Sequence, residues 1–497
     1  MSTCIPPAPT GPIVFTDPFD SVILDHWVNT LREITFVNQH EALKMQSQYV
    51  FVTLAAGSVL LPAVLASAAA HMSTMGLLSP VVALGKNERA LREMSRSMRT
   101  ISNQSLTINN RATSTKVHEA LRAIKDDTVA ASIVLVGSGV IQGHELSQIL
   151  PLIRGSASLI REWYHYLKCT CVRAHPARRD PNLGLDRKMY QIAARMLANF
   201  DIMSCVPCAR APILQSRYWF DDLHSELTSQ PFPIPDTCLG YCGRVYTILG
   251  ESASLIEKLY TTAITPDTFA ELQDHLLSQL GIAASEIPPL KANQPQPPPP
   301  PPPPPAPPET DSKQSNEKAK SPTVQSDAEK EIVETHNGCV SSAIAHMLAA
   351  KIFLLRAVNH DQSSPRIRQL AEALELALNS ISLDSTALNI ILWPLLVLGC
   401  ESYAGDERRK RVTDFFDRVF EKLKVVNIKT CQDVVEKRIW KLGSLSSLSP
   451  TSVADSGFGE ELEVSGNVDE VKSSSSKTLQ AAWVRYCWQE RIEIMLA

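Results

Sequence analysis

The fold of this chain is decided by residues 388–440, which read LNIILWPLLVLGCESYAGDERRKRVTDFFDRVFEKLKVVNIKTCQDVVEKRIW. The first part, residues 388–400, is almost wholly apolar and too short to cross a bilayer, so it predicts a buried helix. Trp393 lies inside this apolar run. We therefore expect the hydrophobic core to pass through residues 388–400, with Trp393 as a core residue.

The rest of the stretch carries two further helical patterns. Between Val412 and Leu423, apolar residues recur at helical spacing and charged residues fill the gaps, which indicates an amphipathic helix with one solvated face. The segment from Thr430 to Asp433 resembles the start of a helix with a capping box, and this helix is expected to end at Trp440. Three consecutive helices that pack face to face are the predicted result.

Short motifs in this stretch occur in a recognisable order. Trp393-Pro394-Leu395 precedes Gly399-Cys400-Glu401, an Arg-rich amphipathic helix follows, and Val426-Asn427-Ile428 leads into the helix ending in Trp440. This order resembles the C-terminal signature of a fungal-specific transcription factor domain. Similar pieces come in the family's order at 65–72, 90–91, 154–159, 198–204 and 239–242.

The resemblance implies a gene regulator with a separate DNA-binding module. In this family the helical domain usually follows a zinc binuclear cluster made from six closely spaced cysteines. The domain itself is thought to govern activity through partner contacts, dimerisation or small-molecule sensing. The chain has eleven cysteines but no such cluster among them. We therefore expect no direct specific DNA binding from this chain, and a partner or an appended module should supply the DNA contact.

Composition agrees with a large helical protein. The chain has 497 residues, 44% of them hydrophobic and only 20 of them Gly, which suits one large helical domain. No strand-like alternation of any length is visible. The net charge of -4 argues against an overall basic surface for nucleic acid. The N-terminus lacks the pattern of a signal peptide, so an intracellular protein with reduced cysteines is expected.

The predicted fold class is all-α, a large single helical body of packed antiparallel helices with two disordered insertions. Nine uninterrupted prolines at 297–305, followed by a polar segment, favour an extended chain that cannot form a core. The predicted segments are a disordered N-terminus (1–18), the first part of the helical domain (19–290), a polyproline and polar insertion (291–331), the second part of the domain (332–443), a Ser-rich insertion (444–477) and a C-terminal helix (478–497).

One apolar run raises the question of a membrane. Residues 49–72, YVFVTLAAGSVLLPAVLASAAAHM, are long enough and free enough of charge to span a bilayer. Pro62 favours another interpretation, because proline is tolerated in the first turn of a helix, here one running to Met72. We therefore expect no membrane insertion.

Four cysteines are the best candidates for a metal site. Cys205 and Cys208 form a CxxC pair, and Cys238 and Cys242 form a second pair with one residue too many for the commonest zinc spacing. Burial of the four as apolar side chains is the alternative and the default. A redox role for Cys205 and Cys208 needs a strand-to-helix context that the sequence does not indicate. We predict no metal and no other cofactor.

Two basic runs stand out in the sequence. Arg408, Arg409, Lys410 and Arg411 form a candidate nuclear import signal, although such a run is more often the solvated face of a helix. The basic run at 173–179 is a similar but weaker candidate.

Enzymatic motifs are not found in the sequence. His224 has carboxylates beside it, but neighbours along a helix point apart and no second His lies one turn later. His71 on an apolar helix is typical of a core histidine with satisfied hydrogen bonds. The GxSxG, HExxH, Walker and dinucleotide-binding motifs are missing, so we predict no enzyme and no catalytic residue.

Two functions from different classes agree with these observations. The first is a nuclear transcriptional regulator that acts through protein partners, with a homodimer as one option. The second is a cytoplasmic interaction scaffold that uses residues 297–305 to recruit a proline-binding module. Nuclear localisation of tagged protein and changed expression of specific genes on deletion distinguish the first from the second.

Overall fold

A computed structural model describes residues 17–38, 58–108, 115–173, 183–220, 234–291, 327–444, 482–492 and 494. Within these ranges the chain is helical and forms no β-strand, with only an isolated bridge between Asp236 and Gly240. The prediction of an all-α fold is confirmed. The predicted disorder at 1–18, 291–331 and 444–477 falls largely on residues outside the described ranges. Residues 327–331 and 444 are described, and they are helical.

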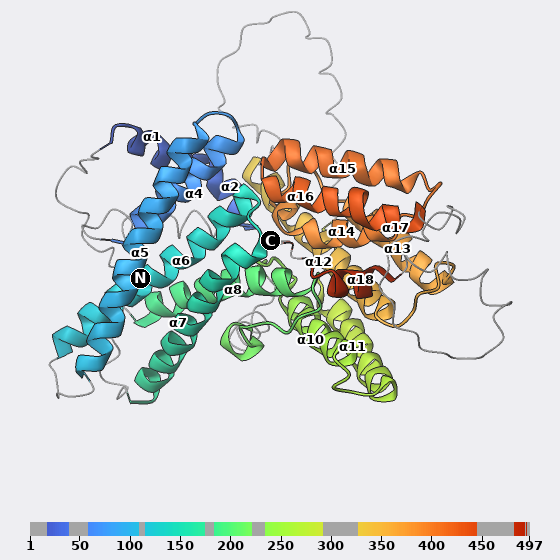
Figure 1. The fold of residues 1–497 in the computed structure, drawn as a ribbon, viewed down its shortest axis with the longest axis horizontal. Helices are drawn as coiled ribbons and strands as arrows, with labels where there is room; N and C mark the ends of the chain where they lie inside the picture. Colours follow the sequence, from blue (N-terminus) through green and yellow to red (C-terminus); the bar gives the residue numbers. More distant parts are fainter. Residues whose placement is uncertain are drawn as a thin grey trace, which may run out of the picture.

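The helices pack around two hydrophobic cores (Figure 1). In chain order they are α1 (Phe19–His26), the π-helix η1 (Trp27–Leu31), α2 (Arg32–Thr35), α4 (Leu60–Thr74), α5 (Pro80–Ile108), α6 (Thr115–Gln142), α7 (Leu146–Arg173), α8 (Leu183–Cys205), the 3-10 helix η3 (Ser216–Tyr218), α10 (Gly243–Tyr260), α11 (Pro266–Glu286), α12 (Asp327–Arg356), α13 (Pro365–Asn379), the 3-10 helix η4 (Thr386–Ile390), α14 (Leu392–Cys400), α15 (Arg408–Leu423), α16 (Val426–Val434), the π-helix η5 (Val435–Ile439), α17 (Trp440–Ser444) and α18 (Trp483–Gln489).

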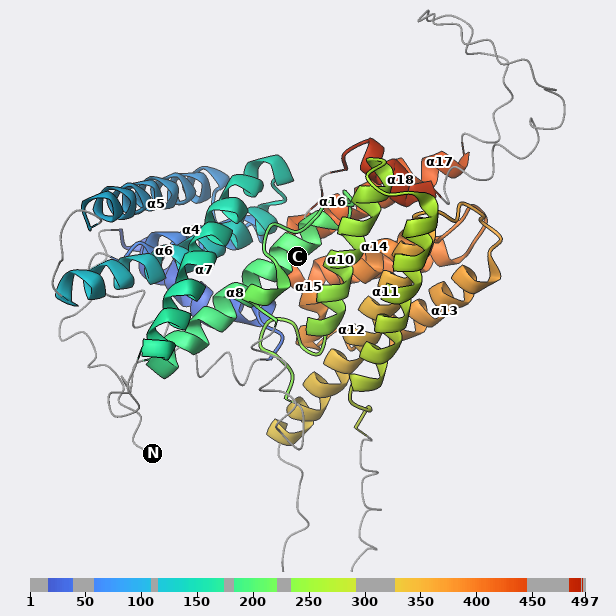
Figure 2. The same cartoon turned by 90° about the horizontal axis from the view of Figure 1, so that it is seen from below.

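The first core, which we call the alanine-rich core, lies between α1, α4, α5 and one face of α6. Small side chains of α4 form its centre, because Ala66, Ser67 and the three alanines at 68–70 are all buried. Small residues let neighbouring helices approach closely. Figure 2 shows α5 at the outer edge of the molecule, beside α4 and α6.

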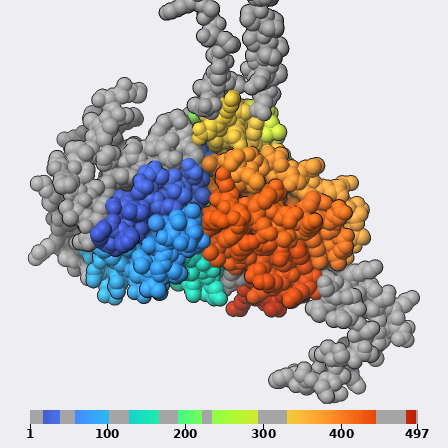
Figure 3. All heavy atoms as spheres, turned by 90° about the horizontal axis from the view of Figure 1, so that it is seen from above, coloured from blue at the N-terminus to red at the C-terminus, as the bar shows by residue number. Residues whose placement is uncertain are grey.

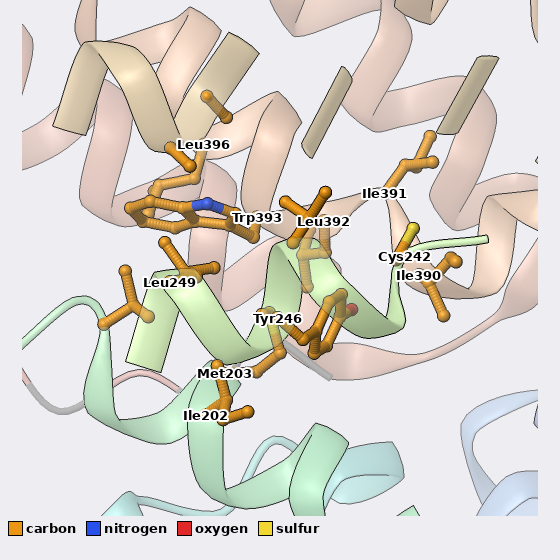
Figure 4. Close-up of a cluster of buried hydrophobic side chains, with 14 of the residues drawn as sticks. Ile202, Met203, Cys242, Tyr246, Leu249, Ile390, Ile391, Leu392, Trp393 and Leu396 are labelled. Carbon is orange, nitrogen blue, oxygen red and sulfur yellow. The ribbon is translucent and has the colours of Figure 1, made fainter. Parts of the chain in front are cut away.

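The second core, which we call the main core, fills the rest of the molecule and includes the other face of α6. Trp393 of α14 is fully buried at its centre, with the Phe353 ring at 5.4 Å and perpendicular to it. In Figure 4, Trp393 lies between Leu396 and Leu249 of α10, and Leu392 lies next to Tyr246 of the same helix. The prediction that Trp393 is a core residue is confirmed.

The helical pattern of residues 388–440 is only partly followed by the structure. Helix α15 buries the predicted apolar face between Val412 and Leu423. The apolar run is divided, however, into η4 and α14. The predicted capping box at Thr430 is wrong, because α16 already begins at Val426. Lys424 takes a left-handed conformation that ends α15, and Val425 is extended, so the new helix starts immediately after the turn.

The apolar run at 49–72 is described only in its second half. Helix α4 begins at Leu60, and Pro62 lies in its first turn as the sequence predicts. Residues 39–57 lie outside the described ranges. A different segment, Lys330–Arg356 of α12, is long and apolar enough to cross a membrane, but 83% of its most apolar window is buried inside the protein. This burial identifies it as the central helix of the main core.

The second part of the domain and the C-terminal helix differ in extent from the prediction. Helix α12 begins at Asp327, before the predicted boundary at 332. Helix α18 covers only Trp483–Gln489, because Arg491 takes a left-handed conformation just beyond its end. The helix docks on the body through Trp483, which is fully buried and donates a hydrogen bond from Nε1 to Glu401 Oε1 at 2.9 Å.

Candidate functional site

A cavity of about 150 Å³ lies where the alanine-rich core meets the main core. On the surface, the same joint separates the blue N-terminal residues from the orange C-terminal ones in Figure 3. We call it the joint cavity. Its walls come from both sides of the joint and include Leu31, Leu60, Ile133, Leu388, Leu392 and Ile428.

The chemistry of the lining is apolar and uncharged. No Asp, Glu, Lys, Arg or His side chain lines the cavity within the part of the chain that the structure describes. Three aromatic rings, those of Trp27, Phe36 and Phe200, contribute to the wall. Such a lining favours a neutral apolar molecule, since an ion would lose its hydration without compensation.

Asn389 of η4 is one of the few polar residues in the lining. Its Nδ2 donates hydrogen bonds to the carbonyl oxygens of Glu33 at 2.9 Å and Phe36 at 3.3 Å. These two bonds fix the orientation of the amide, because a flipped amide would place Oδ1 against two carbonyl oxygens. Oδ1 is buried and has no hydrogen-bond partner among the described residues.

Asn199 of α8 presents a second buried amide oxygen at the cavity. Its Oδ1 also has no hydrogen-bond partner in the described structure. A buried acceptor without a partner costs about 1–3 kcal/mol. Two such acceptors in the lining of one cavity are therefore the main chemical feature of this site.

A pair of histidines connects the alanine-rich core to the wall of the joint cavity. Nε2 of His26 lies 2.9 Å from Nδ1 of His71, and Nε2 of His71 lies 3.0 Å from the carbonyl oxygen of Leu423, a lining residue. In the arrangement that satisfies both contacts, each Nε2 donates. Burial is the largest cause lowering the pKa of both imidazoles, and the neighbouring His71 lowers the pKa of His26 further.

The hydrogen bonds of this pair hold α1, α4 and the end of α15 together. The hydroxyl of Thr74 adds a bond to the carbonyl oxygen of Lys424 at 2.8 Å. The expectation that His71 is a core histidine with satisfied hydrogen bonds is confirmed. His224 lies outside the described residues.

The four candidate zinc ligands each take part in local packing. The Cys205 thiol donates towards the Ala211 carbonyl oxygen at 3.5 Å, and the Cys208 thiol donates to the Ile492 carbonyl oxygen at 3.2 Å. Cys238 is buried, and Cys242 Sγ lies 3.7 Å from His346 Nδ1.

The protonation of these thiols does not favour metal binding. Burial raises the pKa of Cys205 and Cys238, and it raises that of Cys242 to about 12. Zinc binds the thiolate, whose formation this burial opposes. Within the described ranges, no group of three Cys, His, Asp or Glu side chains has the geometry of a metal site.

The structure places the four basic residues of the candidate import signal at the start of α15. Arg408 is buried, with Nε 2.8 Å from Glu375 Oε2, and Nε of Arg411 lies 2.6 Å from Glu375 Oε1. Arg409 donates from Nε to the Ser402 carbonyl oxygen at 3.0 Å, whereas Lys410 is exposed. An import receptor that reads all four side chains would have to displace these contacts. The import role stays a prediction.

The family of the chain follows from a sequence comparison. Residues 22–451 match the fungal specific transcription factor domain. The chain belongs to this family. Comparison with curated proteins and with solved structures gave no match. The family is regulatory rather than enzymatic, and it indicates a role in transcription and a nuclear protein.

The sequence did not single out the joint cavity or its two asparagines. Asn389 and Asn199 each stand in an apolar helical segment, within LNIILW and ANFDIM respectively. A polar residue in an apolar helix was the available signal. Their common position at one cavity depends on contacts between segments far apart in the chain, which local periodicity does not indicate.

Proposed function

We propose that this protein regulates transcription and that its helical domain is the regulatory part, with output set by what occupies the joint cavity. The family match over residues 22–451 carries the proposal, because it extends on both sides of the polyproline insertion. The position of the cavity supports a sensing role. A molecule bound there contacts both cores, so its binding energy depends on how the two cores pack against each other.

DNA contact comes from a partner or from an appended module in this proposal. The chain has a net charge of -4, and three of the four side chains in its strongest basic run contact the fold. Affinity for DNA grows with the number of phosphates neutralised and falls steeply with salt, so this run alone gives weak binding. In a fluorescence anisotropy titration of the purified chain at physiological salt, we expect no preference for any DNA sequence. Sequence-selective binding at nanomolar concentration would require a recognition element in this chain.

A deletion experiment tests the regulatory function. We expect tagged protein to concentrate in the nucleus and deletion of the gene to change transcript levels of a defined set of genes. A uniform cytoplasmic signal together with an unchanged transcript profile would instead support the scaffold function at residues 297–305.

A matched pair of variants connects the transcriptional effect to the cavity. Gly137 lines the cavity, and a Cβ at this position meets only Phe200 Cζ at 3.6 Å, so Gly137→Leu should fill the space. Gly281 is also a helical glycine, but a Cβ there has nothing within 4 Å. Gly281→Leu therefore controls for the change in helix propensity. We expect only Gly137→Leu to alter the response of the target genes.

A further inference from the structure

We propose that the joint cavity binds a small neutral ring compound of about the size of phenol, whose hydroxyl or N–H group donates a hydrogen bond to Asn389 Oδ1. The inference rests on the proposed function, in which this cavity is the sensing site. It adds the size, the charge and the polar group of the ligand, and each of these follows from a separate observation.

The volume limits the size of the ligand. The cavity measures about 150 Å³. An apolar protein cavity of about this size, 150 Å³, accommodates a benzene ring. A single ring with a short substituent therefore fits, whereas a fused multi-ring skeleton or a long acyl chain requires the walls to move.

The lining determines the charge and the shape. Because no charged side chain lines the cavity within the described residues, a carboxylate or an ammonium group would be buried without an opposite charge. The rings of Trp27, Phe36 and Phe200 offer aromatic surface, against which another ring can pack edge to face or offset. A neutral aromatic or alicyclic ring satisfies both conditions.

The fixed amide of Asn389 determines the polar group. Its Nδ2 is held by Glu33 and Phe36, so the atom left without a partner is an acceptor, Oδ1. A ligand with an O–H or N–H donor satisfies this acceptor, and a ligand that carries only acceptors does not. Asn199, whose buried Oδ1 also has no hydrogen-bond partner in the described structure, is a second polar residue of the lining.

Four probe compounds separate these requirements in one binding experiment on the purified full-length chain. Phenol has the ring and the donor, toluene has the ring alone, anisole has a ring with an acceptor, and benzoate carries a charge. Isothermal titration calorimetry and the shift of the melting temperature report binding. We expect phenol to bind about tenfold more tightly than toluene or anisole, as one hydrogen bond of about 1.4 kcal/mol implies, and benzoate to show no binding.

Two variants assign the effect to the cavity and to the amide. In Asn389→Ala, phenol and toluene should bind with about equal affinity. Retained toluene binding shows that the cavity is intact. Gly137→Leu should abolish binding of both compounds, while Gly281→Leu should leave both unchanged. The Gly137→Leu result keeps the test decisive even if Asn389→Ala loosens the contact with Glu33 and Phe36.

Three results overturn the inference: no probe binds, toluene binds as tightly as phenol, or Gly137→Leu leaves binding unchanged. The readout involves no gene expression, so its failure leaves the proposed regulatory function standing. Conversely, an unchanged transcript profile on deletion, together with selective phenol binding, would remove the regulatory function and leave the binding site.

Discussion

The two cores of the molecule are built from different side chains. The alanine-rich core contains Ala residues along α4, α5 and α6, and its fully buried members include no aromatic ring. The main core contains large side chains, among them Trp393, Trp483 and Phe353, whose rings pack against one another. Small side chains permit close approach of helices but offer little apolar area to each contact, whereas the rings contribute large areas.

The cavity lies where these two cores meet. Trp27, Leu31 and Leu60 line it from the side of the alanine-rich core, and Ile133, Leu392 and Ile428 line it from the main core. Hydrogen bonds from His71 and Thr74 to the end of α15 hold the layer in place. The following predictions test the contrast between the cores, from the largest effect to the smallest.

The largest effect is expected in the main core. Truncation of Trp393 to Ala removes a fully buried ring and should lower the free energy of unfolding by about 3–5 kcal/mol. Chemical denaturation monitored by circular dichroism measures the change. Leu376→Ala on the exposed side of α13 is the control and should change stability by less than about 0.5 kcal/mol. An equal effect of the two substitutions would place Trp393 outside the core.

The alanine-rich core should be destabilised by a larger side chain, whereas the main core is destabilised by a smaller one. Ala66 of α4 is fully buried between neighbouring helices, so Ala66→Leu should cost about 1–3 kcal/mol. Ala270→Leu on the exposed face of α11 provides the same substitution without the crowding. If Ala66→Leu were as stable as Ala270→Leu, the packing of α4 would be looser than we describe.

Acid should weaken the alanine-rich core through its histidine pair. The pKa values of His26 and His71 are lowered from the ordinary 6.5, mainly by burial, so the folded state holds both rings neutral. The two neutral rings make their full contribution to the free energy of unfolding above about pH 6.5. This contribution decreases as the pH falls below 6.5, and no further stability is lost below the pKa of the folded state.

The variant His71→Gln isolates this contribution. His346 in the main core, whose pKa burial lowers to about 4, is present in both proteins and cancels in the comparison. Denaturation curves between about pH 7.5 and pH 5 should show a smaller loss of stability with acid in His71→Gln than in the wild type. Identical pH dependence of the two proteins would contradict a role for the pair.

The smallest effect concerns the exposed side of α5. Gly85 lies in this helix, and a Cβ there meets nothing within 4 Å, so Gly85→Ala should stabilise the protein by about 0.5–1 kcal/mol. The same change at Gly143 should destabilise it, because this residue has a φ of +69° and a Cβ would lie 2.7 Å from Val426 Cγ1. Thermal melts of the two variants should shift in opposite directions.

Apolar runs and helical periodicity in the sequence predicted which helix faces are buried, because this depends on residues close together in the chain. The apolar run around Trp393 and the periodicity from Val412 to Leu423 indicated buried helical faces, and both are buried. The start of α16 was missed, because the backbone conformation of Lys424 and Val425 outweighs the capping signal at Thr430.

The site was not predictable in the same way. The joint cavity brings together residues from η1, α6, α8 and η4, and their distances depend on how two separate cores dock. The unpartnered oxygen of Asn389 exists only because the ends of α2 and η4 meet, where its Nδ2 binds Glu33 and Phe36. No periodicity in a single segment contains this information.

One measurement tests most directly whether the joint cavity controls gene expression. Cells that lack the gene receive the wild type, Gly137→Leu or Gly281→Leu at equal protein levels, and their transcripts are sequenced. We predict that Gly281→Leu restores the wild-type profile, whereas Gly137→Leu accumulates as folded protein but leaves the target genes misregulated. Full restoration by Gly137→Leu would contradict the account, because the protein would then regulate its genes with the cavity filled.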